Sequence, residues 1–169
     1  MAMDDLLDAI RDRLITKQGR PKDSPDLDAR RVFIVHRGER PASPPYPHVL
    51  LYDAGSPVDR HMSRQKEIHD MVNIEVLTKI NLPRGAHVVG SASPDRYYPA
   101  NSAIFIAGQI EDLLDDWPVV DSDGNSLSYD VSEYLDRTES VPVDEERVAT
   151  SSVTLHFRFI RFEIHTQPT

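Results

Sequence analysis

Residues 68–80, IHDMVNIEVLTKI, alternate so regularly between apolar and polar side chains that they favour one long β-strand. Successive side chains of a strand point to opposite faces, and the apolar face here consists of Ile68, Val72, Ile74, Val76, Thr78 and Ile80. Asp70 is the charged exception on that face. A strand of this length extends about 43 Å, whereas strands of compact domains usually have about five or six residues. We therefore expect part of it to leave the core of its own domain.

A second long strand is expected in residues 149–165, ATSSVTLHFRFIRFEIH. Its apolar side chains alternate and then change phase, in the order Val153, Leu155, Phe157, Phe159, Ile160, Phe162 and Ile164. Such a change turns later side chains to the opposite face unless a bulge absorbs it, so we expect the strand either to bend or to be covered on both sides. Without proline before Pro168, it should be a central strand whose far end meets another surface. Arg158 and Arg161 alternate there with aromatic residues, a mixture typical of interfaces, and are candidate interface residues.

Two amphipathic helices are expected, over residues 3–17 and 102–116, because leucine and isoleucine recur there at helical spacing. The first has acids in its first turn and bases in its last, which suits the helix dipole. The second has acids near its C-terminal end, which oppose the dipole, so we expect that end to be exposed or paired with arginine from elsewhere.

The segments between these elements supply further candidate interface residues. Short strands are expected at 31–36 and 48–55, on either side of a proline-rich crossing. The polar loop at 56–65 carries Arg60, His61 and Arg64, which suit contact with an acidic partner or are simply solvated. A long loop at 81–100 carries Tyr97 and Tyr98, which suit an interface or local packing. This order of elements predicts a single α+β domain over residues 1–169, with two helices packed on one face of a mostly antiparallel sheet and long strands that extend into intersubunit contacts.

Composition narrows the chemistry of the chain. It has no cysteine, which excludes disulfides, thiolate metal sites and cysteine nucleophiles. The net charge of −9 disfavours general nucleic-acid binding, which depends on Lys and Arg. Acids are mostly Asp and bases mostly Arg, which suits either a salt-rich cytoplasm or a GC-rich genome. No apolar run is long enough to span a bilayer and the N-terminus is acidic, so we expect no membrane association.

Sequence motifs give no support to an enzyme or a cofactor. The chain lacks nucleophile-elbow, phosphate-loop, dinucleotide and HExxH motifs, and its histidines form no i, i+2 or i, i+4 pair. Asp121, Asp123 and Asn125 alternate like the start of a calcium loop. Such a loop needs Gly at residue 126 and Glu at residue 132, where the chain has serine. We therefore interpret Asp121–Asn125 as a turn at Asp-Gly-Asn and expect no metal there.

Two segments, YPHVLLYDAG (46–55) and KEIHDMVNIEVLTKINLP (66–83), resemble the tail terminator proteins of long-tailed bacterial and archaeal viruses. In that family a short N-terminal helix precedes a similar strand, a charged loop, an alternating strand, a helix and a closing strand like VTLHFRFIRFEIH (153–165). The resemblance extends over about residues 4–165 and rests on element order and pattern. SASPDRYYPANS (91–102) and RTESVPVDEERVA (137–149) are longer than the family pattern requires.

The resemblance implies a structural virion protein without catalytic activity. It would form a homo-oligomeric ring, usually hexameric, that caps the tail tube, fixes its length and joins the tail to the head connector or stopper protein. It would lie at the head–tail junction of the virion after assembly in the host cytoplasm, with DNA only as passing cargo. Another connector, head completion or tail tube protein is the alternative, and a small metal-dependent enzyme the outside alternative.

Overall fold

The computed structural model describes residues 2–17, 34–37, 48–61, 65–81, 87–88, 96–97, 103–139, 143–145 and 148–164. The proline-rich crossing lies outside these ranges. The elements are α1 (Ala2–Lys17), β1 (Ile34–Arg37), β2 (His48–Asp53), β3 (Val58–His61), β4 (Gln65–Asn81), β5 (His87–Val88), β6 (Arg96–Tyr97), α2 (Ala103–Leu114), β7 (Val131–Glu139), β8 (Val143–Glu145) and β9 (Val148–Ile164).

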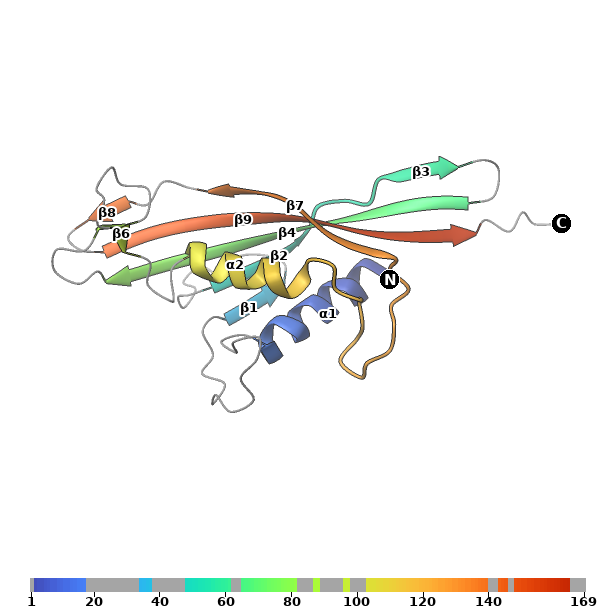
Figure 1. Ribbon diagram of the computed structural model, residues 1–169, viewed down its shortest axis with the longest axis horizontal. Coiled ribbons are helices and arrows are strands. Elements are labelled where there is room, and N and C mark those ends of the chain that lie inside the picture. Colours follow the sequence, from blue (N-terminus) through green and yellow to red (C-terminus); the bar gives the residue numbers. More distant parts are fainter. Residues whose placement is uncertain are drawn as a thin grey trace.

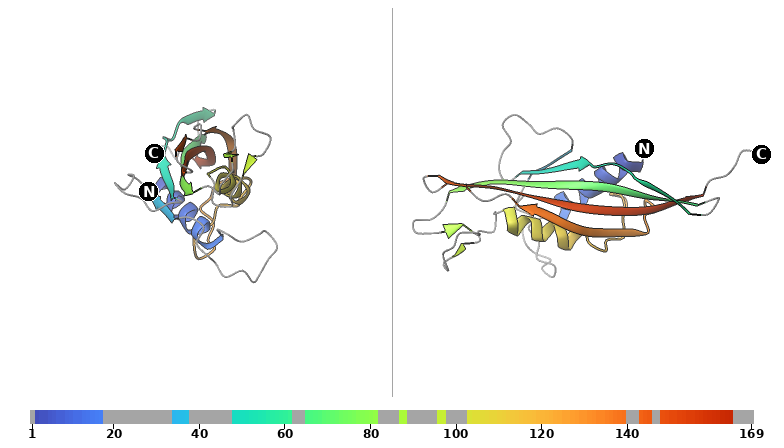
Figure 2. Two further views of the ribbon diagram at one scale, coloured as in Figure 1. Left: turned by 90° about the vertical axis from the view of Figure 1, so that its left-hand side faces the viewer. Right: turned by 90° about the horizontal axis from the view of Figure 1, so that it is seen from above.

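Seven of the described strands form one sheet, with the order β1-β2-β4-β9-β7, β3 beside β4 and β8 beside β9. β1 and β2 are parallel, and the other pairs in this sheet are antiparallel. Both helices lie on the same side of the sheet (Figures 1 and 2). The predicted α+β fold, with two helices on one face of a mostly antiparallel sheet, is confirmed.

The centre of the sheet is the pair formed by β4 and β9, which are hydrogen-bonded along 17 residues of each strand. The predicted apolar face of β4 is confirmed for Val72, Ile74 and Val76, which are buried towards the helices. β9 lies between β4 and β7, so its predicted central position is also confirmed. The two strands run side by side from one end of the molecule to the other (Figure 1).

The change of phase in β9 has a different cause from the one expected. Its register with β4 is unbroken, and the irregularity lies in the neighbouring strand, between Tyr134 and Asp136 of β7. Phe157 and Phe159 face the core, and Arg161 occupies the next position on that face. The later apolar residues point to the other face, where Phe162 is exposed. No bulge in β9 absorbs the change, and the predicted cover on both sides is wrong, because the strand leaves the core at this point.

The helices bury their apolar stripes against the inner face of the sheet. α1 contributes Leu6, Ile10 and Leu14 to the core, and α2 contributes Ile106 and Ile110. Complete burial of such a side chain stabilises the fold by about 1.5–3 kcal/mol, so packing of the apolar stripes is what holds both helices against the sheet. Within the described residues, no helix combines the length and the hydropathy needed to cross a membrane.

The segment predicted as a polar loop at 56–65 contains a strand. β3 pairs with the start of β4, with Val58 opposite Ile68. Between β2 and β3 the chain stays beside β4, because the amides of His69 and Met71 donate to the carbonyls of Pro57 and Gly55. The loop prediction was wrong because the long strand β4 offers a row of backbone donors and acceptors to a segment with little strand propensity of its own. The predicted loop at 81–100 contains the small parallel sheet of β5 and β6.

Candidate intersubunit interface

The sheet extends past the helices as an arm. β3, the first residues of β4 and the last residues of β9 form this end of the molecule, and neither helix covers it (Figure 1). We define the sheet arm as residues 58–61, 65–69 and 160–164. Its backbone is held by the β3–β4 and β4–β9 ladders. The prediction that the long strands outrun their own core is thus confirmed for this end of the sheet.

A buried carboxylate marks the junction between the core and the sheet arm. Asp70 is fully buried. Its Oδ1 accepts a 2.5 Å hydrogen bond from Ser56 Oγ, and its Oδ2 accepts bonds from Tyr129 Oη at 2.6 Å and Arg161 Nε at 2.8 Å. Glu163 accepts a further hydrogen bond from the guanidinium of Arg161. Three segments far apart in the sequence are joined at this one side chain, which satisfies the requirement that a buried charge be paired and hydrogen-bonded.

The electrostatics of this junction favour an ionised aspartate. Burial by itself raises the pKa of Asp70, but the hydrogen bonds from Ser56, Tyr129 and Arg161 and the positive charge of Arg161 outweigh it, so the pKa lies below its ordinary value. Burial and the bond to Asp70 raise the pKa of Tyr129 well above its ordinary value. The tyrosine therefore remains a neutral donor, and the aspartate remains an acceptor, across the neutral pH range.

The outer face of the sheet arm, turned away from the helices, carries a row of apolar side chains that the first residue of β7 continues. This outer patch consists of Val131, Ile160, Phe162 and Ile164. Val131 lies opposite Ile160, and the other two follow at alternate positions of β9. Phe162 is 43% exposed and Ile164 78% exposed. A contiguous apolar surface of this kind is characteristic of a contact with another macromolecule.

A charged pair lies next to the outer patch. Arg158 donates hydrogen bonds to Oε2 of Glu133, at 3.0 Å from Nε and 2.5 Å from Nη2. The two residues are cross-strand partners on β9 and β7. Both side chains are partly exposed, so this pair provides a polar border to the apolar surface, the arrangement that protein interfaces commonly have.

The two predicted arginines lie on opposite faces of β9. Arg158 is on the outer face beside the outer patch, whereas Arg161 is on the inner face and is bonded to Asp70 and Glu163 of its own chain. Arg161 therefore holds the sheet arm to the core. Its additional role at an interface stays a prediction.

Of the other predicted interface residues, those in described strands, Arg60, His61 and Tyr97, are not brought together. Arg60 and His61 belong to β3, and Tyr97 belongs to β6 near the opposite end of the molecule (Figure 1). Their side chains lie outside the described part of the structure, as do Arg64 and Tyr98 entirely. The candidate set thus divides between two distant regions.

A mixed cluster of potential metal ligands lies on the outer face near the outer patch. Nε2 of His69 is 2.6 Å from Oε1 of Glu67 and 3.8 Å from Oδ2 of Asp59. This set contains one histidine, so the spacing of the histidines along the chain could not indicate it. The available signal was Glu67-x-His69, which places an acid and an imidazole on one face of a strand.

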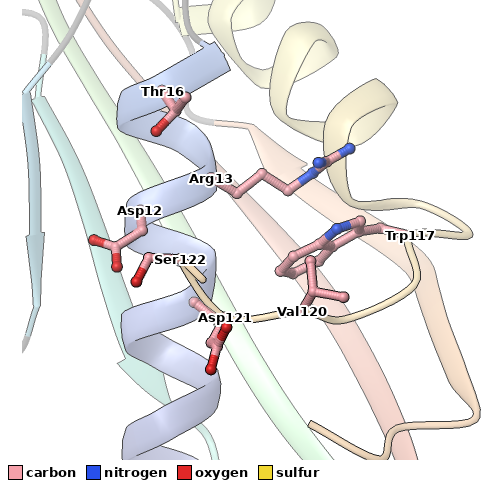
Figure 3. Close-up of a pocket in the computed structure, with 8 residues that line it drawn as sticks. Asp12, Arg13, Thr16, Trp117, Val120, Asp121 and Ser122 are labelled. Carbon is pink, nitrogen blue, oxygen red and sulfur yellow. The ribbon is translucent and has the colours of Figure 1, made fainter. Parts of the chain in front are cut away.

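A separate shallow groove of about 170 Å³ lies between α1 and the segment after α2 (Figure 3). The Arg13 guanidinium lies 4.9 Å from the centroid of the Trp117 ring, and its Nε donates a 2.7 Å hydrogen bond to the carbonyl oxygen of Leu113. This cation lies at the C-terminal end of α2, where its favourable interaction with the helix dipole offsets the unfavourable interaction of the acids there. The groove is smaller than most small-molecule sites, and its main contacts hold the two helices together.

The stretch at 121–125 is a closed turn, as predicted. Oδ1 of Asp121 accepts hydrogen bonds from the amides of Asp123 and Asn125, at 2.9 and 2.8 Å. Gly124 has a φ of +86°, and Val120 pairs with Ser126 across the turn. The carboxylate of Asp121 is therefore used to order the backbone of the turn.

The sequence did not reveal the partners of Asp70, although a charged residue within an apolar alternation indicates that a partner exists.

Comparison of the chain with family models and with curated proteins finds no match. Within the described structure, the outer patch of the sheet arm is the candidate surface for contact with a partner, because its apolar side chains are exposed.

Proposed function

We propose that the chain is a structural virion protein of the tail terminator class. It forms a ring, hexameric in the family it resembles, that caps the tail tube, ends its polymerisation and joins the tail to the head connector. The observation that supports this proposal most directly is the sheet arm, in which β4 and β9 continue past the helices and expose the outer patch.

The sheet arm suits contact with a second copy of the chain. Phe162 and Ile164 supply apolar area that water covers in the isolated subunit, and its burial is the main driving force of association. The Arg158–Glu133 pair borders this area. Because the continuous β4–β9 ladder already fixes the backbone of the arm, docking orders few additional residues.

Net charge supports a role around a DNA channel. The chain carries −9 at neutral pH. A ring of such subunits repels the phosphate backbone and so favours the passage of DNA through the lumen over its retention.

The test is the assembly state of the purified chain at low and high salt, measured by multi-angle light scattering and negative-stain microscopy. Closed rings of uniform mass are expected, either alone or after addition of purified tail tubes, which provide the end on which a terminator assembles. Capped tubes that no longer elongate would establish the terminating step.

Two other outcomes would contradict the proposal. Long open tubes formed by the chain itself would assign it to the tail tube proteins. Monomers under every salt condition, with no binding to tube ends, would remove the basis for a ring-forming protein altogether.

A further inference from the structure

Three side chains of the sheet arm converge on one point of its outer face. A ligand atom from each of Asp59, Glu67 and His69 lies within 4.8 Å of the other two. Glu67 and His69 are alternate residues of β4, and Asp59 is the cross-strand partner of Glu67 on β3. Two hydrogen-bonded strands thus fix the backbone positions of all three, with their ligand atoms already gathered around one point.

The charges of the three groups match a divalent ion. Two carboxylates face the same nitrogen atom, Nε2 of His69. That atom carries one proton at most and therefore donates to one carboxylate at a time. A protonated imidazole leaves a net charge of −1 among the three groups, whereas a divalent ion bound by a neutral imidazole and two carboxylates leaves none.

The surroundings restrict the type of ion. Phe162 and Ile160 are the cross-strand partners of Glu67 and His69 on β9, so one side of the cluster is apolar, which strengthens electrostatic attraction there. The side chains of His69 and Glu67 are only 16% and 20% exposed, while that of Asp59 is 69% exposed. An imidazole ligand favours zinc, cobalt or nickel over magnesium and calcium, which prefer oxygen ligands alone.

We propose that Asp59, Glu67 and His69 bind one divalent transition-metal ion of the zinc class. The three protein ligands leave one tetrahedral position open to solvent. Because Asp59 belongs to β3 and the other two ligands belong to β4, the ion ties the short strand β3 to the long one and stiffens the end of the sheet arm. This site does not depend on the ring-forming function proposed above.

Binding is tested on the untagged full-length chain with Co²⁺ and Zn²⁺. We expect one Co²⁺ per chain with the visible absorption of a tetrahedral complex, and its displacement by Zn²⁺. Asp59→Asn, Glu67→Gln and His69→Ala each remove one ligand and should weaken the affinity by at least about tenfold. Hydrogen exchange of the amides in 58–61 and 65–69 should slow on addition of Zn²⁺.

The matched control is His156→Ala. His156 lies on the same face, but among the described residues one carboxylate, that of Asp136, lies within 4 Å of it, at 3.9 Å, and its Nδ1 is 2.8 Å from Oδ1 of Asn73. Its removal should leave the affinity unchanged. Absence of Co²⁺ and Zn²⁺ binding at micromolar concentrations, or binding that survives the loss of any one of the three ligands, would overturn the site.

Discussion

Arg161 Nε donates a 2.8 Å hydrogen bond to Oδ2 of Asp70, diagonally across the β4–β9 pair, in which Asp70 faces Phe159 and Arg161 faces Ile68. This contact lies where the apolar face of β9 ends. It replaces hydrophobic packing by a charged contact at the point where the helices no longer cover the sheet, and thereby connects the core to the sheet arm.

Asp70→Asn should lower the free energy of unfolding by about 2 kcal/mol, because it removes the charge that pairs with the partly buried Arg161 and weakens three hydrogen bonds. Urea denaturation at neutral pH measures the loss. Glu133→Gln is the matched control, since it removes the partner of Arg158 at a more exposed pair and should cost less than about 1 kcal/mol. Equal losses of unfolding free energy in the two variants would mean that the buried Asp70 contributes no more to stability than the partly exposed Glu133.

The contribution of Asp70 should depend on pH in one direction. Its folded-state pKa is lowered, so its stabilising effect is complete above the unfolded-state pKa of about 3.9 and is lost as pH falls below that value through the folded-state pKa. The difference in unfolding free energy between the wild type and Asp70→Asn should be constant from neutral pH to about pH 5 and should shrink below about pH 4. Denaturation curves at a series of pH values test this, and a difference that grows on acidification would contradict it.

Phe162→Ser combined with Ile164→Ser should prevent assembly and leave the subunit folded, because Phe162 is 43% exposed and Ile164 78% exposed in the monomer. Light scattering reports the mass of the particles and circular dichroism the fold. Ile15→Ser serves as control, since Ile15 is similarly exposed but belongs to α1, outside the sheet arm. Rings that persist in the double variant would exclude the outer patch as the contact.

Arg13→Met should destabilise the protein by about 2 kcal/mol, because it removes a charged hydrogen bond to Leu113 and the cation over the Trp117 ring. The chain has one tryptophan, so its fluorescence reports both unfolding and the change around the ring. Arg11→Met, at a neighbouring partly exposed ion pair with Asp12, should have a smaller effect. If Arg11→Met lost as much stability, the effect would come from removing a positive charge from α1 and not from the contacts of Arg13.

Gly124→Ala and Gly108→Ala should change stability in opposite directions. Gly124 has a φ of +86°, so a side chain there strains the turn by about 1–2 kcal/mol. Gly108 lies within α2 with no heavy atom within 4 Å of an added Cβ, so alanine should stabilise the helix by about 0.5–1 kcal/mol. Thermal denaturation distinguishes the two, and a stabilising Gly124→Ala would show that the turn relaxes.

The regular elements were predictable because each has a strong local pattern. The bounds of both helices, both long strands and the turn at 121–125 agree with the ranges predicted from the sequence to within a few residues. β3 was not predictable in the same way, since its four residues include one strongly strand-forming side chain, Val58, and it pairs because β4 lies beside it. The cluster of Asp59, Glu67 and His69 was not predictable for a related reason, because Asp59 lies beside Glu67 only through the pairing of β3 with β4.

The sequence alone determined the α+β class, the central place of the last strand and the excess length of residues 68–80, because periodicity and strand length are local properties of the chain. Only the tertiary structure decided what the change of phase in the last strand means. The helices end before β9 does, so Arg161 meets Asp70 at the limit of the core, and Phe162 and Ile164 are left on the open face of the sheet arm. Which face of a strand is covered depends on where other segments pack, and no local pattern contains that information.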